Sequence, residues 1–103
     1  MQQSFASQTY SEQLQRVSKN EQLAQSFVVK SVQDDIGYVW IATTQGLFRF
    51  DGYQVTPYEN QTDLKNNYII NMYKTNNGSI LVSTQLAGSY LIDPSSLKAK
   101  QIY

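Results

Sequence analysis

From position 27 onward, short runs of branched aliphatic and aromatic residues alternate with turn signals such as Asx-Gly pairs. Apolar positions in these runs follow a period of two, and the runs are too short for helices of about ten residues or more. The Asx-Gly pairs supply the positive φ that a tight hairpin needs. We therefore predict strands at 27–33, 38–43, 47–51, 53–58, 68–74, 79–84, 89–93 and 97–103.

The second half of this strand series repeats the first. Residues 27–44 align with residues 68–85 at an offset of 41, and one inserted residue after Gln85 raises the offset to 42. A period of about 40 to 45 residues is the length of one four-stranded propeller blade or of a two-helix solenoid repeat, and the strand pattern favours the blade. Matched pairs include Gly37 and Gly78, Thr43 and Thr84, Gly46 and Gly88, Phe50 and Ile92, and Asp51 and Asp93.

The predicted fold is all-β, with two four-stranded antiparallel blades over residues 27–67 and 68–103. We expect less than about a tenth of the chain in helix, against roughly a third in an average globular protein. Both faces of the segments VVKSV and VWIAT are apolar or small, as in a sheet covered on both sides. Trp40 is expected to be a large packing anchor between the blades. Pro57 restricts its own strand to a sheet edge.

Residues 1–26 form a lead-in to the first blade. A weak further copy of the repeat in this region predicts an edge strand at about 12–18. In a closed ring this strand would complete the last blade. The same region also fits an amphipathic helix over 12–25, and this alternative stays open. This copy places Leu14, Val17 and Leu23 41 residues before Val55, Tyr58 and Leu64.

Composition excludes several classes of function. Lysine and arginine together number eight, as do aspartate and glutamate, so no basic field indicates nucleic acid or an anionic membrane surface. The chain has no cysteine and no histidine, which removes thiolate and imidazole chemistry and most zinc or haem ligation. No apolar run reaches the roughly 18 residues of a membrane span. We expect no catalytic residue, no cofactor and no required metal.

The segment QDDIGYVWIATTQGLFRFDGYQVTPY (33–58) resembles the repeat of the two-component regulator propeller family. In the second unit Leu81 stands in place of Trp40 and Ser83 in place of the usual glycine, while Ala42 is the departure in the first unit. The motif positions of the first unit are Gln33, Asp34, Gly37, Trp40, Ile41, Thr43, Gly46, Leu47, Arg49, Phe50, Asp51, Gly52 and Tyr58. The second unit keeps Gly78, Thr84, Gly88 and Asp93.

This resemblance implies a larger parent protein, an exported bacterial sensor with a propeller of about seven blades. Such proteins place the propeller in the periplasm and carry a transmembrane helix and a cytoplasmic output, usually a histidine kinase or a GGDEF-type diguanylate cyclase. The implied partners are the remaining blades or other copies of this chain, with a small-molecule or oligosaccharide ligand. A propeller scaffold for protein partners, without a signalling output, is the alternative.

Three features have both a functional and a structural interpretation. Asp34 and Asp35 could be paired catalytic carboxylates or calcium ligands, but an aspartate before a hairpin glycine usually stabilises the turn. Arg49 could bind an anionic ligand or a sugar, although a pair with Asp51 or a solvated role is favoured. Trp40 and the tyrosines could stack on a sugar ring, and packing between blades is favoured for most of them.

Overall fold

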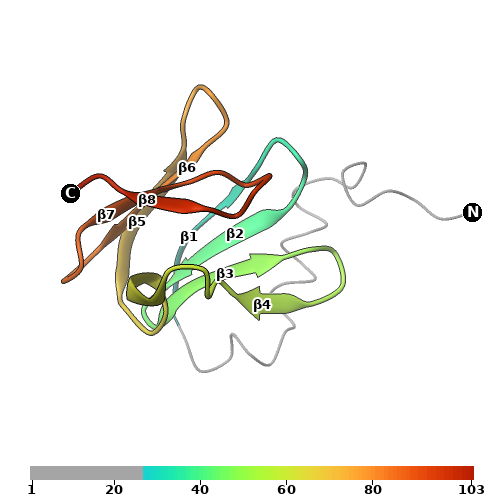
Figure 1. Cartoon of the computed structure of the whole chain (residues 1–103). Coiled ribbons are helices and arrows are strands. Elements are labelled where there is room, and N and C mark those ends of the chain that lie inside the picture. Colours follow the sequence, from blue (N-terminus) through green and yellow to red (C-terminus); the bar gives the residue numbers. More distant parts are fainter. Residues whose placement is uncertain (1–26) are drawn as a thin grey trace, which may run out of the picture.

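A computed structural model describes residues 27–103, which form two four-stranded antiparallel sheets (Figure 1). Both sheets pair their strands in chain order, and a short 3₁₀ helix, η3 (Thr62–Leu64), lies in the connection between them. The first sheet contains β1 (Val28–Gln33), β2 (Val39–Thr43), β3 (Gly46–Phe50) and β4 (Val55–Pro57). The second sheet contains β5 (Ile69–Lys74), β6 (Ile80–Thr84), β7 (Ser89–Ile92) and β8 (Ala99–Gln101).

The all-β prediction is confirmed for the described residues, in which helix is limited to the three residues of η3. Each predicted strand from position 27 onward overlaps one observed strand. Pro57 lies in β4, which within residues 27–103 pairs only with β3 and is an edge strand there, as the missing N–H of proline requires. The lead-in 1–26, with its strand at 12–18 or helix at 12–25, lies outside the described residues.

The two sheets repeat each other in backbone detail as well as in strand order. The register of β1 against β2 shifts between Val28 and Lys30, and that of β5 against β6 shifts between Ile69 and Asn71. Both shifts lie at the same place in the repeat, because the two pairs of residues are 41 positions apart. A bulge that recurs in this way is a property of the repeated unit rather than an accident of one strand.

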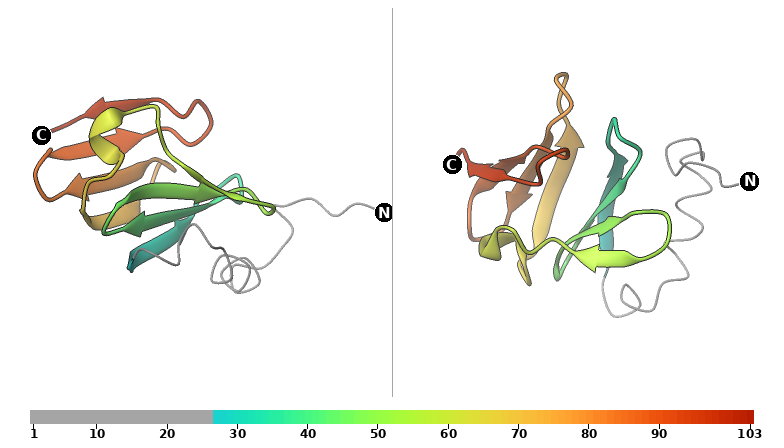
Figure 2. Two further views of the ribbon diagram at one scale, coloured as in Figure 1. Left: turned by 90° about the horizontal axis from the view of Figure 1, so that it is seen from below. Right: turned by 45° about the vertical axis from the view of Figure 1, so that its right-hand side comes forward.

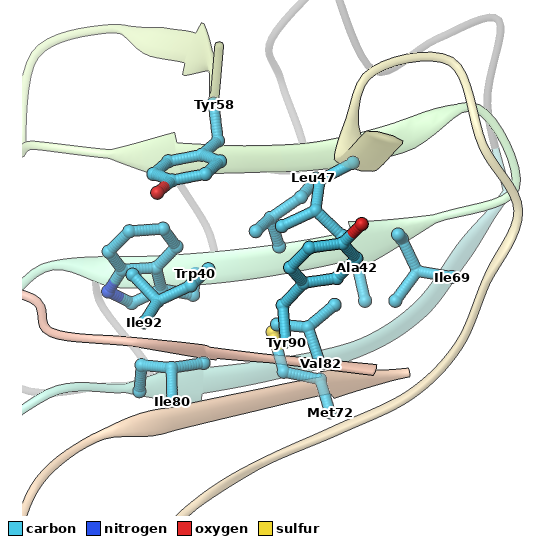
Figure 3. Packing of buried hydrophobic residues seen from close by; sticks show 11 residues of the cluster. Trp40, Ala42, Leu47, Tyr58, Ile69, Met72, Ile80, Val82, Tyr90 and Ile92 are labelled. Carbon is cyan, nitrogen blue, oxygen red and sulfur yellow. The ribbon is translucent and has the colours of Figure 1, made fainter. Parts of the chain in front are cut away.

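Buried apolar side chains from both sheets meet in one cluster between them (Figure 3). The two sheets lie beside each other as separate layers, with β1 next to β5 (Figure 2). The first sheet contributes Trp40, Ala42 and Leu47, with Tyr58 just after β4; the second sheet contributes Ile69, Met72, Ile80, Val82, Tyr90 and Ile92; Leu64 of η3 completes the set. This interface is the largest apolar core of residues 27–103.

The two sheets meet through non-equivalent faces, and we call this arrangement head-to-tail stacking. Ile80 and Val82 of the second sheet pack in the cluster between the two sheets. Their counterparts in the first repeat are Val39 and Ile41. Those two residues lie in a separate cluster, with Phe50 and Val55, on the opposite face of the first sheet from Trp40. Each sheet therefore has two different faces, and the interface joins one face of each kind.

Burial on both faces is found for β2 but not for all of β1. All five residues of β2 are buried. In β1, Val28 is 51% exposed and Val29 is 39% exposed, so the expectation of two covered faces is wrong for this half of the strand. Ile69, which stands at the place of Val28 in β5, is buried between the sheets, so the layer beside the strand decides this burial and not the strand itself.

Candidate functional site

The β1–β2 turn is organised by one buried carboxylate. Asp34 is 4% exposed, and its Oδ1 accepts hydrogen bonds from the backbone N–H groups of Ile36, Gly37 and Tyr38 at 2.9, 2.8 and 3.0 Å. Its Oδ2 accepts the indole N–H of Trp40 at 2.7 Å. Asp34 thus satisfies four donors and fixes both the turn and the ring that fills the inter-sheet core. The turn role of Asp34 was expected, whereas its link to Trp40 was not.

The second sheet lacks both members of this pair. At the positions of Asp34 and Trp40 it has Thr75 and Leu81. The Thr75 hydroxyl accepts the backbone N–H of Ser79 at 3.1 Å, so the turn keeps a side-chain cap, and Leu81 brings no polar group that needs a carboxylate. The joint loss of the aspartate and the tryptophan is the signal in the sequence that could have revealed their contact.

Asp35 has a different role from Asp34. Its exposed carboxylate accepts a hydrogen bond from the ammonium group of Lys74 at 2.7 Å, which joins the hairpin tips of the two sheets. A Cβ at Gly78 would lie 2.8 Å from Asp35 Oδ2, so glycine lets the tips approach closely. The two aspartates therefore do not share a site, and the paired-carboxylate interpretation has no geometric support.

Threonine hydroxyls close the β2–β3 and β6–β7 turns in the same way. Thr43 Oγ1 donates to the carbonyl of Gly46 at 2.7 Å, and Thr84 Oγ1 donates to the carbonyl of Gly88 at 2.8 Å. Gly46 has φ +125°, and a Cβ there would lie 2.9 Å from the backbone nitrogen of Asn66. Glycine is required at Gly46 because the β4–β5 connection passes directly over it. Leu47, the next residue, is buried in the core between the sheets.

The aspartates after β3 and β7 cap the following turns. Asp51 Oδ1 accepts the backbone N–H groups of Tyr53 and Gln54 at 2.9 and 3.0 Å, across Gly52, which has φ +101°. Asp93 Oδ1 accepts the backbone N–H and the hydroxyl of Ser95 at 2.9 and 2.7 Å. These hydrogen bonds from Ser95 lower the pKa of Asp93, because they favour its charged form. Both aspartates act on their own turns.

Arg49 stacks on aromatic rings. Its guanidinium carbon lies 4.3 Å from the ring centroid of Tyr38 and 5.9 Å from that of Trp40. The ion pairs among residues 27–103 join Lys65 to Glu59 and Lys74 to Asp35, so the pair with Asp51 is not formed there. The carboxylate of Asp51 is held by its own turn, which leaves Arg49 to cover the edge of the core as a cation–π partner.

Two tyrosine hydroxyls tie the β4–β5 connection to the second sheet. Tyr58 donates to the carbonyl of Leu97 at 2.6 Å, and Tyr90 donates to Asp63 Oδ2 at 2.5 Å. The hydrogen bond to Asp63 raises the pKa of Tyr90, since it favours the neutral phenol. Leu97, whose carbonyl accepts the hydrogen bond from Tyr58, has a left-handed backbone conformation with φ +63°. These contacts span 27 to 39 positions and carry no local sequence signal.

Burial raises the pKa of Tyr58 from 10.0 to about 12. The neutral phenol is favoured in the fold, so its contribution to stability is complete below pH 10 and is lost as the pH rises to about 12. We expect urea denaturation to show a falling free energy of unfolding across this range. Tyr58→Phe should lower stability at neutral pH by about 1 kcal/mol and should weaken the alkaline decline. An unchanged decline in that variant would contradict the assignment.

No candidate metal centre is found in the part of the chain that the structure describes. Residues 27–103 contain no cluster of three or more His, Cys, Asp or Glu side chains that could hold a metal ion. Nor does any helix in this range have the length and apolar character of a membrane span. Comparison with protein-family models, with curated proteins and with solved structures gives no match. The motif residues meet as a structural network around the turns and the interface.

Proposed function

We propose that this chain supplies two consecutive blades of a β-propeller in the extracytoplasmic sensor part of a bacterial signal-transduction protein. In this proposal the propeller recognises a ligand in the periplasm, and the signal passes to a cytoplasmic histidine kinase or diguanylate cyclase elsewhere in the parent protein. The chain itself is non-catalytic and needs no cofactor. The observation that carries the proposal is the head-to-tail stacking of two sheets with the same strand order and the same bulge.

Head-to-tail stacking supports a propeller because it can be continued. Two sheets that met through equivalent faces would form a closed pair. A contact between non-equivalent faces leaves one free face on each sheet, and a further sheet of the same kind can pack on it in the same way. On the second sheet that face carries Leu81 and Leu91, which are opposite each other in the register and only partly buried. In the repeat, Leu81 and Leu91 correspond to Trp40 and Arg49 of the first sheet. A third blade would cover them.

The sensor role comes from the resemblance of residues 33–58 to the two-component regulator propeller repeat. Several motif residues have a structural task here: Asp34, Thr43, Asp51 and their equivalents close turns, and Trp40 packs between the sheets. A motif that encodes the blade identifies the repeat and not the ligand. Ligand contacts in such a protein are therefore expected to come from the loops of the assembled ring.

Reading the parent gene on both sides of this segment tests the proposal. Further repeats of about 40 to 45 residues, followed by a transmembrane helix and a kinase or cyclase domain, are the expected result. Further repeats without a membrane segment or output domain would instead favour the alternative function, a scaffold that binds protein partners. Flanking sequence without any such repeat would overturn the propeller itself.

We expect the isolated chain to self-associate, because among residues 27–103 no further sheet lies on the face of the second sheet that carries Leu81 and Leu91. Light scattering at micromolar concentration should show a dimer or a larger species. Leu91→Lys, which puts a charge on this face, should shift the population toward monomer, while Ser96→Lys in the exposed β7–β8 turn should not. If the chain without substitutions is a stable, monodisperse monomer, the expectation is contradicted.

A further inference from the structure

Asn77 occupies an exposed position at the tip of the β5–β6 hairpin and precedes Gly78. It is the one asparagine of the sequence that is followed by glycine. An asparagine side chain can be attacked by the backbone nitrogen of the next residue, and a Cβ on that residue hinders the approach. Gly78 has no Cβ and has φ +88°, a region that glycine enters without strain.

We propose that Asn77 is a site of spontaneous deamidation through a succinimide, a covalent modification that needs only water as co-reactant. The Gly78 nitrogen attacks Cγ of Asn77, which forms an N–C bond. The Cγ–Nδ2 bond breaks, and the amide nitrogen leaves as ammonia with the proton from the Gly78 nitrogen. Water then adds to one of the two ring carbonyls and opens the ring to aspartate or isoaspartate at position 77.

The geometry of the turn favours the first step. Asn77 Oδ1 accepts the hydroxyl of Thr75 at 2.5 Å and the backbone N–H of Ser79 at 3.4 Å. These donors draw electron density from the carboxamide carbon of Asn77, which is the atom that the Gly78 nitrogen attacks. One bond opposes the attack, from the Gly78 N–H to the carbonyl of Thr75 at 3.0 Å. It closes an exposed turn, where a single hydrogen bond contributes little net free energy and opens readily.

Other candidate positions in the chain are less suited to the same chemistry. Asp51 also precedes a glycine, but its carboxylate accepts two backbone N–H groups, and Gly52 is buried. Asn71 lies within β5, where its Oδ1 accepts the N–H of Met72 at 2.9 Å. Asn66 and Asn67 are followed by residues that carry a Cβ. Asn77 is therefore expected to react first.

The modification would act on the contact between the two sheets. Gly78 lies against Asp35, whose carboxylate pairs with Lys74 across the hairpin tips. An isoaspartate at position 77 lengthens the turn backbone by one methylene and adds a negative charge close to Asp35. Both changes oppose the close approach of the tips, so the modified chain is expected to hold its sheets together less firmly.

The test is peptide mapping by mass spectrometry after incubation of the whole chain at mildly alkaline pH. The peptide with Asn77 should convert to an aspartate and isoaspartate mixture at least about tenfold faster than the peptides with Asn66, Asn67 or Asn71. Asn77→Gln should abolish this fast conversion, and the matched control Asn76→Gln should retain it. Conversion of Asn77 no faster than that of the other asparagines would overturn the proposal.

Discussion

Trp40→Ala is expected to leave the chain unfolded or aggregated. The Trp40 side chain is fully buried between the sheets, and its ring centroid lies 5.6 Å from that of Tyr58. Removing a buried aromatic costs about 3 to 5 kcal/mol, in a domain whose whole stability is typically about 5 to 15 kcal/mol. The substitution also removes the indole N–H that Asp34 accepts, which leaves part of a buried carboxylate without a partner.

Urea denaturation followed by circular dichroism measures this effect. Tyr53→Ala is the matched control, because Tyr53 is an aromatic that is 78% exposed, and its loss should change stability by no more than about 0.5 kcal/mol. Tyr103→Ala, at an 85% exposed position, should be equally silent. A Trp40→Ala variant that unfolds at the same urea concentration as the parent would show that Trp40 is not between the sheets.

Asp34→Asn and Asp35→Asn are expected to differ sharply, although the two residues are neighbours of the same type. An asparagine at position 34 can keep its oxygen on the three backbone N–H groups, but its NH₂ group then faces the indole N–H of Trp40, donor against donor. The flipped amide leaves the backbone donors unpaired instead. Either way a buried donor loses its acceptor, at a cost of about 1 to 3 kcal/mol.

The exposed ion pair of Asp35 with Lys74 is worth at most about 1 kcal/mol, so Asp35→Asn should be nearly neutral. A double-mutant cycle separates the Asp34–Trp40 contact from the turn itself. In a Trp40→Phe background, where the indole N–H is absent, Asp34→Asn should cost less, with a coupling of about 0.5 to 3 kcal/mol. Equal costs for both aspartates, or no coupling to Trp40, would contradict the network.

The strands were predictable because their signals are local. Period-two runs and Asx-Gly turns lie within a few residues of each other, and the offset of 41 to 42 showed that the unit occurs twice. The same offset predicted equivalent turns, such as those closed by Thr43 and Thr84. Whether these sheets are blades of a larger propeller stays a prediction.

The contacts that were not predicted depend on distant parts of the chain. The hydroxyl of Tyr58 meets Leu97, and that of Tyr90 meets Asp63, and neither pair has a periodic or spacing signal. The exposure of the first half of β1 depends on which layers lie against its faces, because Ile69, at the place of Val28 in β5, is buried between the sheets. Arg49 was expected to pair with Asp51 or to be solvated, but its guanidinium group stacks on the ring of Tyr38.

Nuclear Overhauser effects from the indole protons of Trp40 report which face of the second sheet packs against the first, and so decide whether the sheets stack head-to-tail. Trp40 is the one tryptophan of the chain, so its indole signals are unambiguous. The structure predicts cross-peaks to methyl groups on the inner face of the second sheet, from Ile80 and Ile92 (Figure 3). Cross-peaks to the methyl groups of Leu81 or Leu91 would place the opposite face of that sheet against Trp40 and would contradict the head-to-tail arrangement.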